Sequence, residues 1–191
     1  MLLLPYRFAI GMIESEWKLR NIIIWHKPNQ LPQGVSDRFT NDFEPIFFFA
    51  KSNKYSFNQQ FEAYTKPLDR WGGDELTAKG ISEWSENTGQ NAYRTRNLRP
   101  NPEGRNMRSV WSINTKGESE KHFACYPQQL VNRIIKAGCP EGGIVLDPFM
   151  GSGTTAVVAR KLNRNYVGFE LNPEYIKIAD RKLKRELGLF A

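Results

Sequence analysis

The chain has 191 residues, and its 40% hydrophobic and 13% aromatic content excludes a disordered protein. It holds 27 Lys and Arg against 20 Asp and Glu, and this net charge of +7 favours a polyanionic partner, nucleic acid first, over a merely soluble basic surface. No stretch approaches the roughly 20 apolar residues of a membrane helix, and Cys125 and Cys139 form no metal-binding pattern, so we expect a cytoplasmic protein with reduced thiols, no membrane contact and no metal.

The N-terminal stretch predicts one helix followed by two strands. Residues 2–16 place their large apolar side chains roughly on one side, which is typical of an amphipathic helix. An unbroken apolar, β-branched run covers residues 20–27 and ends at Pro28-Asn29, and a second apolar run covers residues 45–51. Continuous apolar strands of this kind are typical of a sheet that is covered on both faces.

Residues 52–118 have a different composition. They are rich in Asn, Gly, Ser, Glu and Arg, and their large apolar residues are scattered without a clear period. Long stretches of this kind are usually functional or disordered. We therefore predict an irregular insert rather than a separate core domain.

The remainder of the chain alternates helices and strands. A helix is predicted at 128–137, ended by Gly138, with Leu130, Val131, Ile134 and Ile135 on one face. Further along, the pattern predicts a strand at 143–147, a turn at 151–154, a helix at 155–162, a strand at 166–170 and a helix at 174–187. This alternation is typical of an α/β fold.

The unit from 143 to 170 predicts a ligand site at the ends of its two strands. Asp147 ends the first strand, and the Gly151-Ser152-Gly153 turn lets the backbone approach a ligand because glycine has no side chain in the way. The free N–H groups of the next helix face the same crevice. Glu170, at the end of the second strand, can accept both hydroxyls of an unphosphorylated ribose.

Taken alone, the string G-S-G-T-T-A from Gly151 to Ala156 also fits the dinucleotide fingerprint G-x-G-x-x-G/A. A glycine-rich turn in an unrelated α/β protein and a dinucleotide-dependent oxidoreductase are therefore alternatives to any more specific interpretation. The preceding Asp147-Pro148-Phe149 has no role in a nicotinamide enzyme, and this disfavours the oxidoreductase.

The longer string from Asp147 to Thr155, D-P-F-M-G-S-G-T-T, closely resembles the S-adenosylmethionine motif of bacterial DNA N4-cytosine and N6-adenine methyltransferases. Leu171 to Tyr175, L-N-P-E-Y, resembles the next stretch of that family. The resemblance implies S-adenosylmethionine as the cofactor, with an acid near the methionine ammonium and an aromatic ring beside the adenine. The implied cofactor-binding residues are Asp147, Phe149, Gly151, Ser152, Gly153, Thr154, Glu170 and Asn172.

The segment from His122 to Leu130, H-F-A-C-Y-P-Q-Q-L, resembles the family's H-P-A-x-F-P-x-x-L. Phe123 stands where proline is usual and Tyr126 where phenylalanine is usual, and both replacements keep the bulk of the side chain. By resemblance, this segment closes over the methionine end of the cofactor, which adds Phe123, Ala124 and Tyr126 to the predicted site. Residues 19–29 and 44–52 also resemble the family.

The order of these motifs resembles the permuted class of these enzymes, usually called beta, in which the target-side half precedes the cofactor half. The implied fold class is α/β, a circularly permuted, Rossmann-like S-adenosylmethionine-dependent methyltransferase fold. We expect residues 1–55 and 119–191 to form the methyltransferase core and residues 56–118 to form an inserted target-recognition region.

By resemblance, the activity is site-specific methylation of double-stranded DNA in restriction-modification, with transfer of the methyl group to the exocyclic amine of a flipped adenine or cytosine. Residues 29–32 and 37–40 are expected to line the active-site cleft. Interspersed arginines and aromatics in the insert suit phosphate contact and base-edge reading, with a solvated basic loop as the alternative. The predicted DNA-binding arginines are Arg94, Arg96, Arg99, Arg105 and Arg108.

The family's catalytic tetrapeptide, Asp/Asn/Ser-Pro-Pro-Tyr/Phe/Trp, has no counterpart in this sequence, and Leu4-Pro5-Tyr6 is the nearest string. We therefore assign no catalytic residue and expect an incomplete sheet, because the strand that carries this motif normally lies beside the one ending at Asp147. The chain is then a fragment, a subunit whose partner chain supplies the catalytic half, or a rearranged fold. A catalytically inactive or partner-dependent fragment that binds S-adenosylmethionine and DNA stays open beside the active enzyme.

Overall fold

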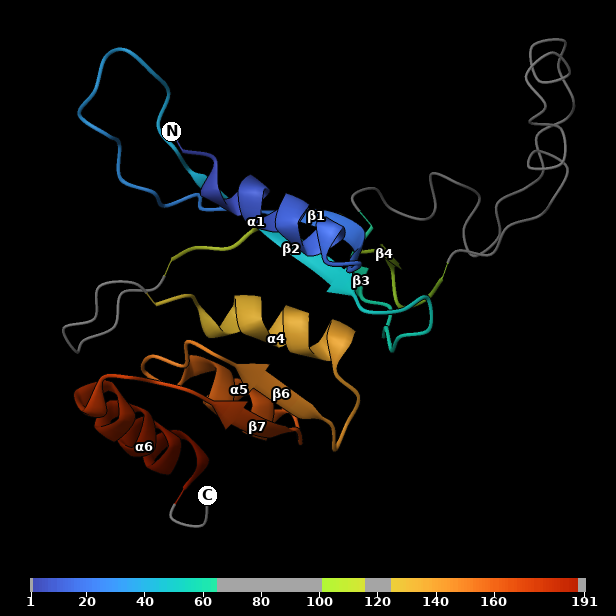
Figure 1. Cartoon of the computed structure of the whole chain (residues 1–191), viewed down its shortest axis with the longest axis vertical. Coiled ribbons are helices and arrows are strands. Elements are labelled where there is room, and N and C mark those ends of the chain that lie inside the picture. Colours follow the sequence, from blue (N-terminus) through green and yellow to red (C-terminus); the bar gives the residue numbers. More distant parts are fainter. Residues whose placement is uncertain (1, 65–100, 116–124, 189–191) are drawn as a thin grey trace, which may run out of the picture. The chain divides into compact units, whose positions relative to one another are not determined.

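The computed structural model describes residues 2–64, 101–115 and 125–188 (Figure 1). Its strands form three sheets, ordered β2-β1-β5, β3-β4 and β6-β7. Contacts divide the chain into one unit of Met1–Asn58 with Ser109–Ala191 and a second unit of Gln59–Arg108. The helices and strands are α1 (Leu4–Glu14), β1 (Lys18–His26), β2 (Phe43–Ala50), β3 (Phe61–Glu62), β4 (Arg105–Asn106), β5 (Val110–Ser112), α4 (Gln128–Gly138), β6 (Ile144–Asp147), α5 (Thr154–Lys161), β7 (Asn165–Gly168) and α6 (Pro173–Leu187).

Among the described residues, no helix combines the length and the apolar character needed to cross a bilayer.

The helix and the two strands predicted for the N-terminal stretch are confirmed as α1, β1 and β2. β1 pairs antiparallel with β2, placing Ile22 opposite Phe47, and the end of β1 pairs parallel with β5. The string Leu4-Pro5-Tyr6 forms the first turn of α1, where proline is tolerated because the N–H that it lacks has no partner within the helix. The Tyr6 ring lies edge-on to Phe47, with the ring centroids 5.7 Å apart.

The expectation that both faces of this sheet are covered is wrong for the described part of the chain. Along β1 and β2, the buried residues are Trp25 and Ala50, and Ile22 is exposed. α1 is the helix that packs against β1. Besides α1, the rings of Tyr55 and Phe57 contact Phe48 of β2, and this incomplete cover leaves apolar side chains such as Ile22 partly exposed.

Side chains from the end of β1 hold the segment that contains β5. The indole N–H of Trp25 donates to the Ile113 carbonyl oxygen at 2.8 Å, and both residues are buried. The side-chain amide of Asn29 pairs with the backbone of Thr115, donating to its carbonyl oxygen at 2.9 Å and accepting from its N–H at 2.9 Å. Asn29 thereby continues beyond β1 the pairing that the strand makes with β5.

The described parts of the predicted insert contain a short antiparallel pair of strands. β3 and β4 pair with Phe61 opposite Asn106 and Glu62 opposite Arg105. Gly104 has a φ of 113°, and a Cβ at this position would collide with the Glu62 carbonyl oxygen, so the close approach of the two backbones requires glycine. Residues 65–100 of the insert lie outside the described residues.

The predicted α/β alternation is confirmed in the C-terminal part of the chain. β6 and β7 run parallel, with Asp147 opposite Gly168, and α5 connects them. α5 packs against α4, α6 and both strands (Figure 1). Its residues 154–159 are all buried. The core cluster consists of Val131, Ile135, Val158 and Ala159.

One face of the β6–β7 pair is exposed. Ile144 and Leu146 are 67% and 62% exposed, and Val167, opposite Leu146, is 45% exposed. Val145 packs against the core cluster, so the two faces of β6 differ. Within the described residues β7 is the strand neighbour of β6, which agrees with the predicted incomplete sheet. Ile134, predicted on the buried face of α4, is also exposed, because α4 packs mainly against one helix, α5.

Candidate cofactor site

The carboxyl ends of β6 and β7 position the predicted acidic residues. Asp147 is the last residue of β6 and pairs with Gly168, the last residue of β7, shortly before Glu170. Parallel strands end at the same edge of a sheet, so both carboxylates reach the turn between β6 and α5. Ligands of open α/β sheets bind in the crevice outside such strand ends.

Glu170 holds the turn from one side. Its Oε2 accepts the Gly151 N–H at 2.9 Å, and its Oε1 accepts the Asn172 N–H at 2.8 Å. A carboxylate offers about four acceptor positions, so each oxygen keeps capacity for a further donor. The predicted contact with ribose hydroxyls is therefore compatible with the hydrogen bonds that Glu170 already makes.

Asp147 holds the turn from the other side. Its Oδ1 accepts the Phe149 N–H at 2.9 Å, and its Oδ2 accepts the hydroxyls of Tyr126 at 2.8 Å and Thr155 at 2.6 Å. Burial is the main cause that raises the pKa of Tyr126 to about 12, so the phenol stays protonated and can donate. Asp147 is thus engaged mainly with groups of the protein itself.

The residues of the turn differ in what they present to a ligand. Phe149 is 85% exposed, so its ring is open to contact, whereas Ser152 and Thr154 are buried. Ser152 Oγ lies 3.5 Å from Cys125 Sγ, and Thr154 Oγ1 accepts a hydrogen bond from the buried Lys182 Nζ at 3.1 Å. A ligand in the crevice would therefore meet the exposed Phe149 ring and the open backbone at Gly151 rather than these two hydroxyls.

The two glycines of the turn have different surroundings. Gly151 and Gly153 adopt positive φ values of 55° and 81°. An added Cβ at Gly153 would lie 2.7 Å from the Cβ of Ala179 on α6, so this glycine allows the close packing of α6. At Gly151 the nearest atom to an added Cβ is the Phe149 carbonyl oxygen at 3.9 Å, which leaves this part of the turn open.

Asn172 has a local structural role. It is the N-cap residue of α6, and its Oδ1 accepts the Glu174 N–H at 3.0 Å. Its predicted contact with the cofactor stays a prediction.

The family model described as DNA methylase, N6_N4_Mtase, matches residues 5–181. The chain belongs to this DNA methylase family. The type II methyltransferase M.Cfr9I of Citrobacter freundii is 37% identical over 183 residues, covering 96% of this chain and 50% of that protein. M.SmaI of Serratia marcescens is 35% identical over 181 residues, covering 95% of this chain and 51% of that protein. The chain thus spans about half the length of these curated relatives.

Solved structures of DNA methyltransferases share the fold. The complex of M1.HpyAVI with SAM has a TM-score of 0.61 at 26% identity, over 96% of this chain and 70% of that one. The cytosine-N4-specific PvuII DNA methyltransferase has a TM-score of 0.62 at 18% identity, over 92% of this chain and 55% of that one. The Rossmann-like α/β methyltransferase fold expected from the sequence is therefore confirmed.

Several residues predicted to serve the DNA methylase lie outside the described residues. They are Phe123 and Ala124 of the cofactor segment and Arg94, Arg96 and Arg99 of the insert. For these residues, as for the division into a core and a target-recognition insert, the sequence analysis stands as a prediction.

Arg105 and Arg108 meet at one carboxylate that the sequence analysis missed. The Nε atoms of Arg105 and Arg108 lie 2.9 Å and 2.7 Å from Glu62 Oε1. Burial pushes the pKa of Glu62 up, but the hydrogen bonds and charges of Arg108 and Arg105 outweigh it and lower the pKa. No local pattern predicts this cluster, since Glu62 and Arg105 are 43 residues apart in the sequence.

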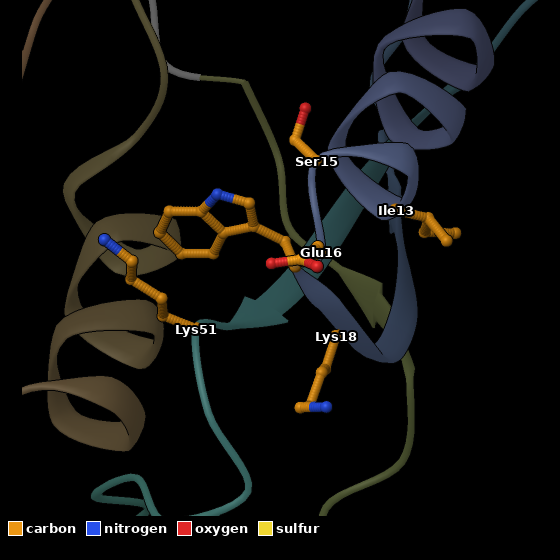
Figure 2. Close-up of a pocket in the computed structure, with 6 residues that line it drawn as sticks. Ile13, Ser15, Glu16, Lys18 and Lys51 are labelled. Atoms are coloured by element: carbon orange, nitrogen blue, oxygen red, sulfur yellow. The ribbon is translucent and has the colours of Figure 1, made fainter.

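A surface hollow elsewhere on the DNA methylase chain has a volume of about 580 Å³ (Figure 2). The residues that line it are Ile13, Ser15, Glu16, Trp17, Lys18 and Lys51. They come from the end of α1, the link between α1 and β1, the start of β1 and the residue that follows β2. No residue of the predicted cofactor or DNA site lines this hollow.

Proposed function

We propose that this chain forms the cofactor-binding part of a DNA methyltransferase. The proposed reaction moves a methyl group from S-adenosylmethionine to the exocyclic amine of adenine or cytosine in double-stranded DNA. One observation carries the proposal: in a chain of the DNA methylase family, Asp147 and Glu170 lie at the ends of adjacent parallel strands and hold the turn between β6 and α5.

The residues around the turn suit S-adenosylmethionine. Glu170 keeps acceptor capacity for the ribose hydroxyls, and the exposed ring of Phe149 offers an apolar face to the adenine. The N-terminal N–H groups of α5 favour an anionic group such as a carboxylate, and Asp147 is the candidate for the ammonium. When bound, the cofactor supplies a methyl group that its sulfonium already activates. The likeness to the M1.HpyAVI–SAM complex supports this assignment.

The proposed DNA partner is supported by charge. The chain carries a net charge of +7, and Arg105 and Arg108 of the insert, both paired with Glu62, are candidates for phosphate contact. The part of the insert outside the described residues would add Arg94, Arg96 and Arg99. The likeness to type II methyltransferases supports a role in restriction-modification, which we expect to take place beside the DNA in the cytoplasm.

We assign the catalytic groups to polypeptide other than these 191 residues, in the same protein or in a second chain. Two observations support this assignment. The face of the β6–β7 pair that carries Ile144, Leu146 and Val167 is exposed. The matched region is also only about half of the relative M.Cfr9I. A catalytically inactive fragment that binds the cofactor is the alternative. Adding the candidate second half to a DNA methylation assay separates the two, since the proposal requires activity when both parts are present and the alternative requires none.

The first test is calorimetric titration of the chain with S-adenosylhomocysteine. We expect Glu170→Ala to bind about tenfold to a hundredfold more weakly than the wild type, because hydrogen bonds to a charged group contribute about 1.5–3 kcal/mol. Glu174→Ala is the matched control, since Glu174 is a nearby exposed carboxylate that pairs with Lys177, and it should bind as the wild type does.

The same titration has outcomes that contradict the proposal. A folded wild-type chain that does not bind S-adenosylhomocysteine has no formed methyl-donor pocket. An equal loss of affinity in Glu170→Ala and Glu174→Ala would contradict a specific role of Glu170 in binding. Binding of NAD in place of S-adenosylhomocysteine would favour the oxidoreductase that the G-S-G-T-T-A string leaves open.

A further inference from the structure

Three oxygen atoms from separate parts of the chain form a triangle beside the cofactor turn. The Tyr126 hydroxyl lies 2.8 Å from Asp147 Oδ2 and 2.7 Å from Thr155 Oγ1, and Thr155 Oγ1 lies 2.6 Å from the same carboxylate oxygen. Tyr126 precedes α4, Asp147 ends β6 and Thr155 lies in the first turn of α5. The triangle therefore joins the segment before α4 to both ends of the turn.

The protons of this triangle are fully used within it. Tyr126 and Thr155 each carry one hydroxyl proton, and the carboxylate of Asp147 brings none. Two protons thus serve three short oxygen–oxygen contacts, so neither hydroxyl keeps a proton to donate to a bound molecule. The other carboxylate oxygen, Oδ1, accepts the Phe149 N–H within the turn. The Tyr126 hydroxyl therefore has no proton to donate to a ligand, and it donates within the protein to Asp147.

The Tyr126 ring has a separate role from its hydroxyl. The ring packs against the core cluster of Val131, Ile135, Val158 and Ala159. Phenylalanine would fill the same space, so packing alone does not account for a tyrosine. The hydroxyl adds a directional bond to a carboxylate, and bonds of this kind are stronger than bonds between neutral groups.

We propose that Tyr126 is a positioning residue for the cofactor. Its hydroxyl fixes the carboxylate of Asp147, and Asp147 in turn fixes the Phe149 N–H and the start of α5 in the shape that receives the ligand. The proposal rests on the function proposed above, and it assigns the gain in binding to preorganisation of the turn rather than to a contact between Tyr126 and the cofactor.

The decisive variant is Tyr126→Phe, which removes the hydroxyl and keeps the ring. We expect binding of S-adenosylhomocysteine about fivefold to tenfold weaker than in the wild type, measured by calorimetry at a temperature where both proteins are fully folded. Tyr166→Phe is the matched control, because Tyr166 is an exposed tyrosine on β7, and its binding should equal that of the wild type.

Variants of Thr155 separate a positioning role of the Tyr126 hydroxyl from a contribution to stability alone. Thr155→Val removes the second hydroxyl, whereas Thr155→Ser keeps it. We expect Thr155→Ser to bind nearly as well as the wild type, and the combined loss of Tyr126→Phe with Thr155→Val to differ from the sum of the single losses, because both hydroxyls act on one carboxylate oxygen. Amide hydrogen exchange of Tyr126→Phe should speed up at Phe149 and Gly151 while the amides of α4 keep their rates.

The outcomes distinguish this inference from the function on which it rests. Wild-type binding with an unchanged Tyr126→Phe affinity overturns the positioning role and leaves the cofactor site intact. If amide exchange in Tyr126→Phe speeds up equally throughout the domain, the hydroxyl has a general structural role, and the positioning role is likewise overturned. A folded wild type that binds no S-adenosylhomocysteine overturns the proposed function and this inference together.

Discussion

Two glycines with a left-handed backbone show how single residues are selected in this chain. Gly153 and Gly142 have φ values of 81° and 73°. An added Cβ at Gly153 would lie 2.7 Å from the Cβ of Ala179, whereas nothing lies within 4 Å of one at Gly142. Gly153 therefore serves both backbone conformation and helix packing, and Gly142 serves conformation alone.

At this residue scale we expect Gly153→Ala to destabilise the protein more than Gly142→Ala does. Both variants place a side chain in the left-handed region at a cost of about 1–2 kcal/mol, and overpacking against Ala179 adds about 1–3 kcal/mol at Gly153. Urea unfolding of the two variants measures the difference. Equal losses of unfolding free energy would show that α6 moves aside without cost.

At the scale of elements, side chains rather than backbone extend the contact between β1 and the β5 segment. The β1–β5 ladder pairs Ile24 to His26 with Val110 to Ser112. Beyond it, the Asn29 side-chain amide donates to the Thr115 carbonyl oxygen and accepts the Thr115 N–H. Thr115 is the last described residue before the cofactor segment that begins at His122 in the sequence.

We expect Asn29→Ala to loosen this segment. The change removes the partners of the Thr115 N–H and carbonyl oxygen, at a cost of about 0.5–1.5 kcal/mol for each hydrogen bond. Amide exchange at Thr115 should accelerate, while exchange in α5 is unaffected. Asn21→Ala, at an exposed position of β1, is the control. Slow exchange at Thr115 in Asn29→Ala would mean that β5 alone holds the segment.

At the scale of the whole molecule, one carboxylate joins the three C-terminal helices. Glu186 on α6 accepts hydrogen bonds from Lys161 on α5 and from Gln128 on α4, the latter at 3.3 Å and 3.2 Å. The hydrogen bond from Lys161 is the main cause that lowers the pKa of Glu186 below 4.5, and it outweighs the opposing effect of burial. The folded state thus favours the ionised form of Glu186.

This lowered pKa gives stability a defined pH dependence. The contribution of Glu186 is present above its unfolded pKa near 4.5 and is lost as the pH falls through the lower folded pKa. We expect the free energy of unfolding, measured by urea titration between about pH 3 and pH 6, to decrease on acidification. Glu186→Gln should flatten this decrease, and the exposed Glu174→Gln should not. A slope that is unchanged in Glu186→Gln would contradict this role.

The local pattern of the sequence determined the elements that build the cofactor site. The apolar run before Asp147, the glycines of the turn and the run before Glu170 each lie within a short stretch, and they became β6, the turn and β7. The reason is that the periodicity and glycine content of a short segment bias its backbone before any long-range contact forms. The family resemblance rests on the same segments.

The tertiary structure alone decided which side chains meet. The contacts of Tyr126 with Asp147, of Thr154 with Lys182 and of Arg105 with Glu62 join residues 21, 28 and 43 positions apart. It also left Ile144 and Leu146 exposed on one face of β6. Such outcomes depend on which elements pack together. The sequence pattern around a side chain does not predict which distant residue it will contact.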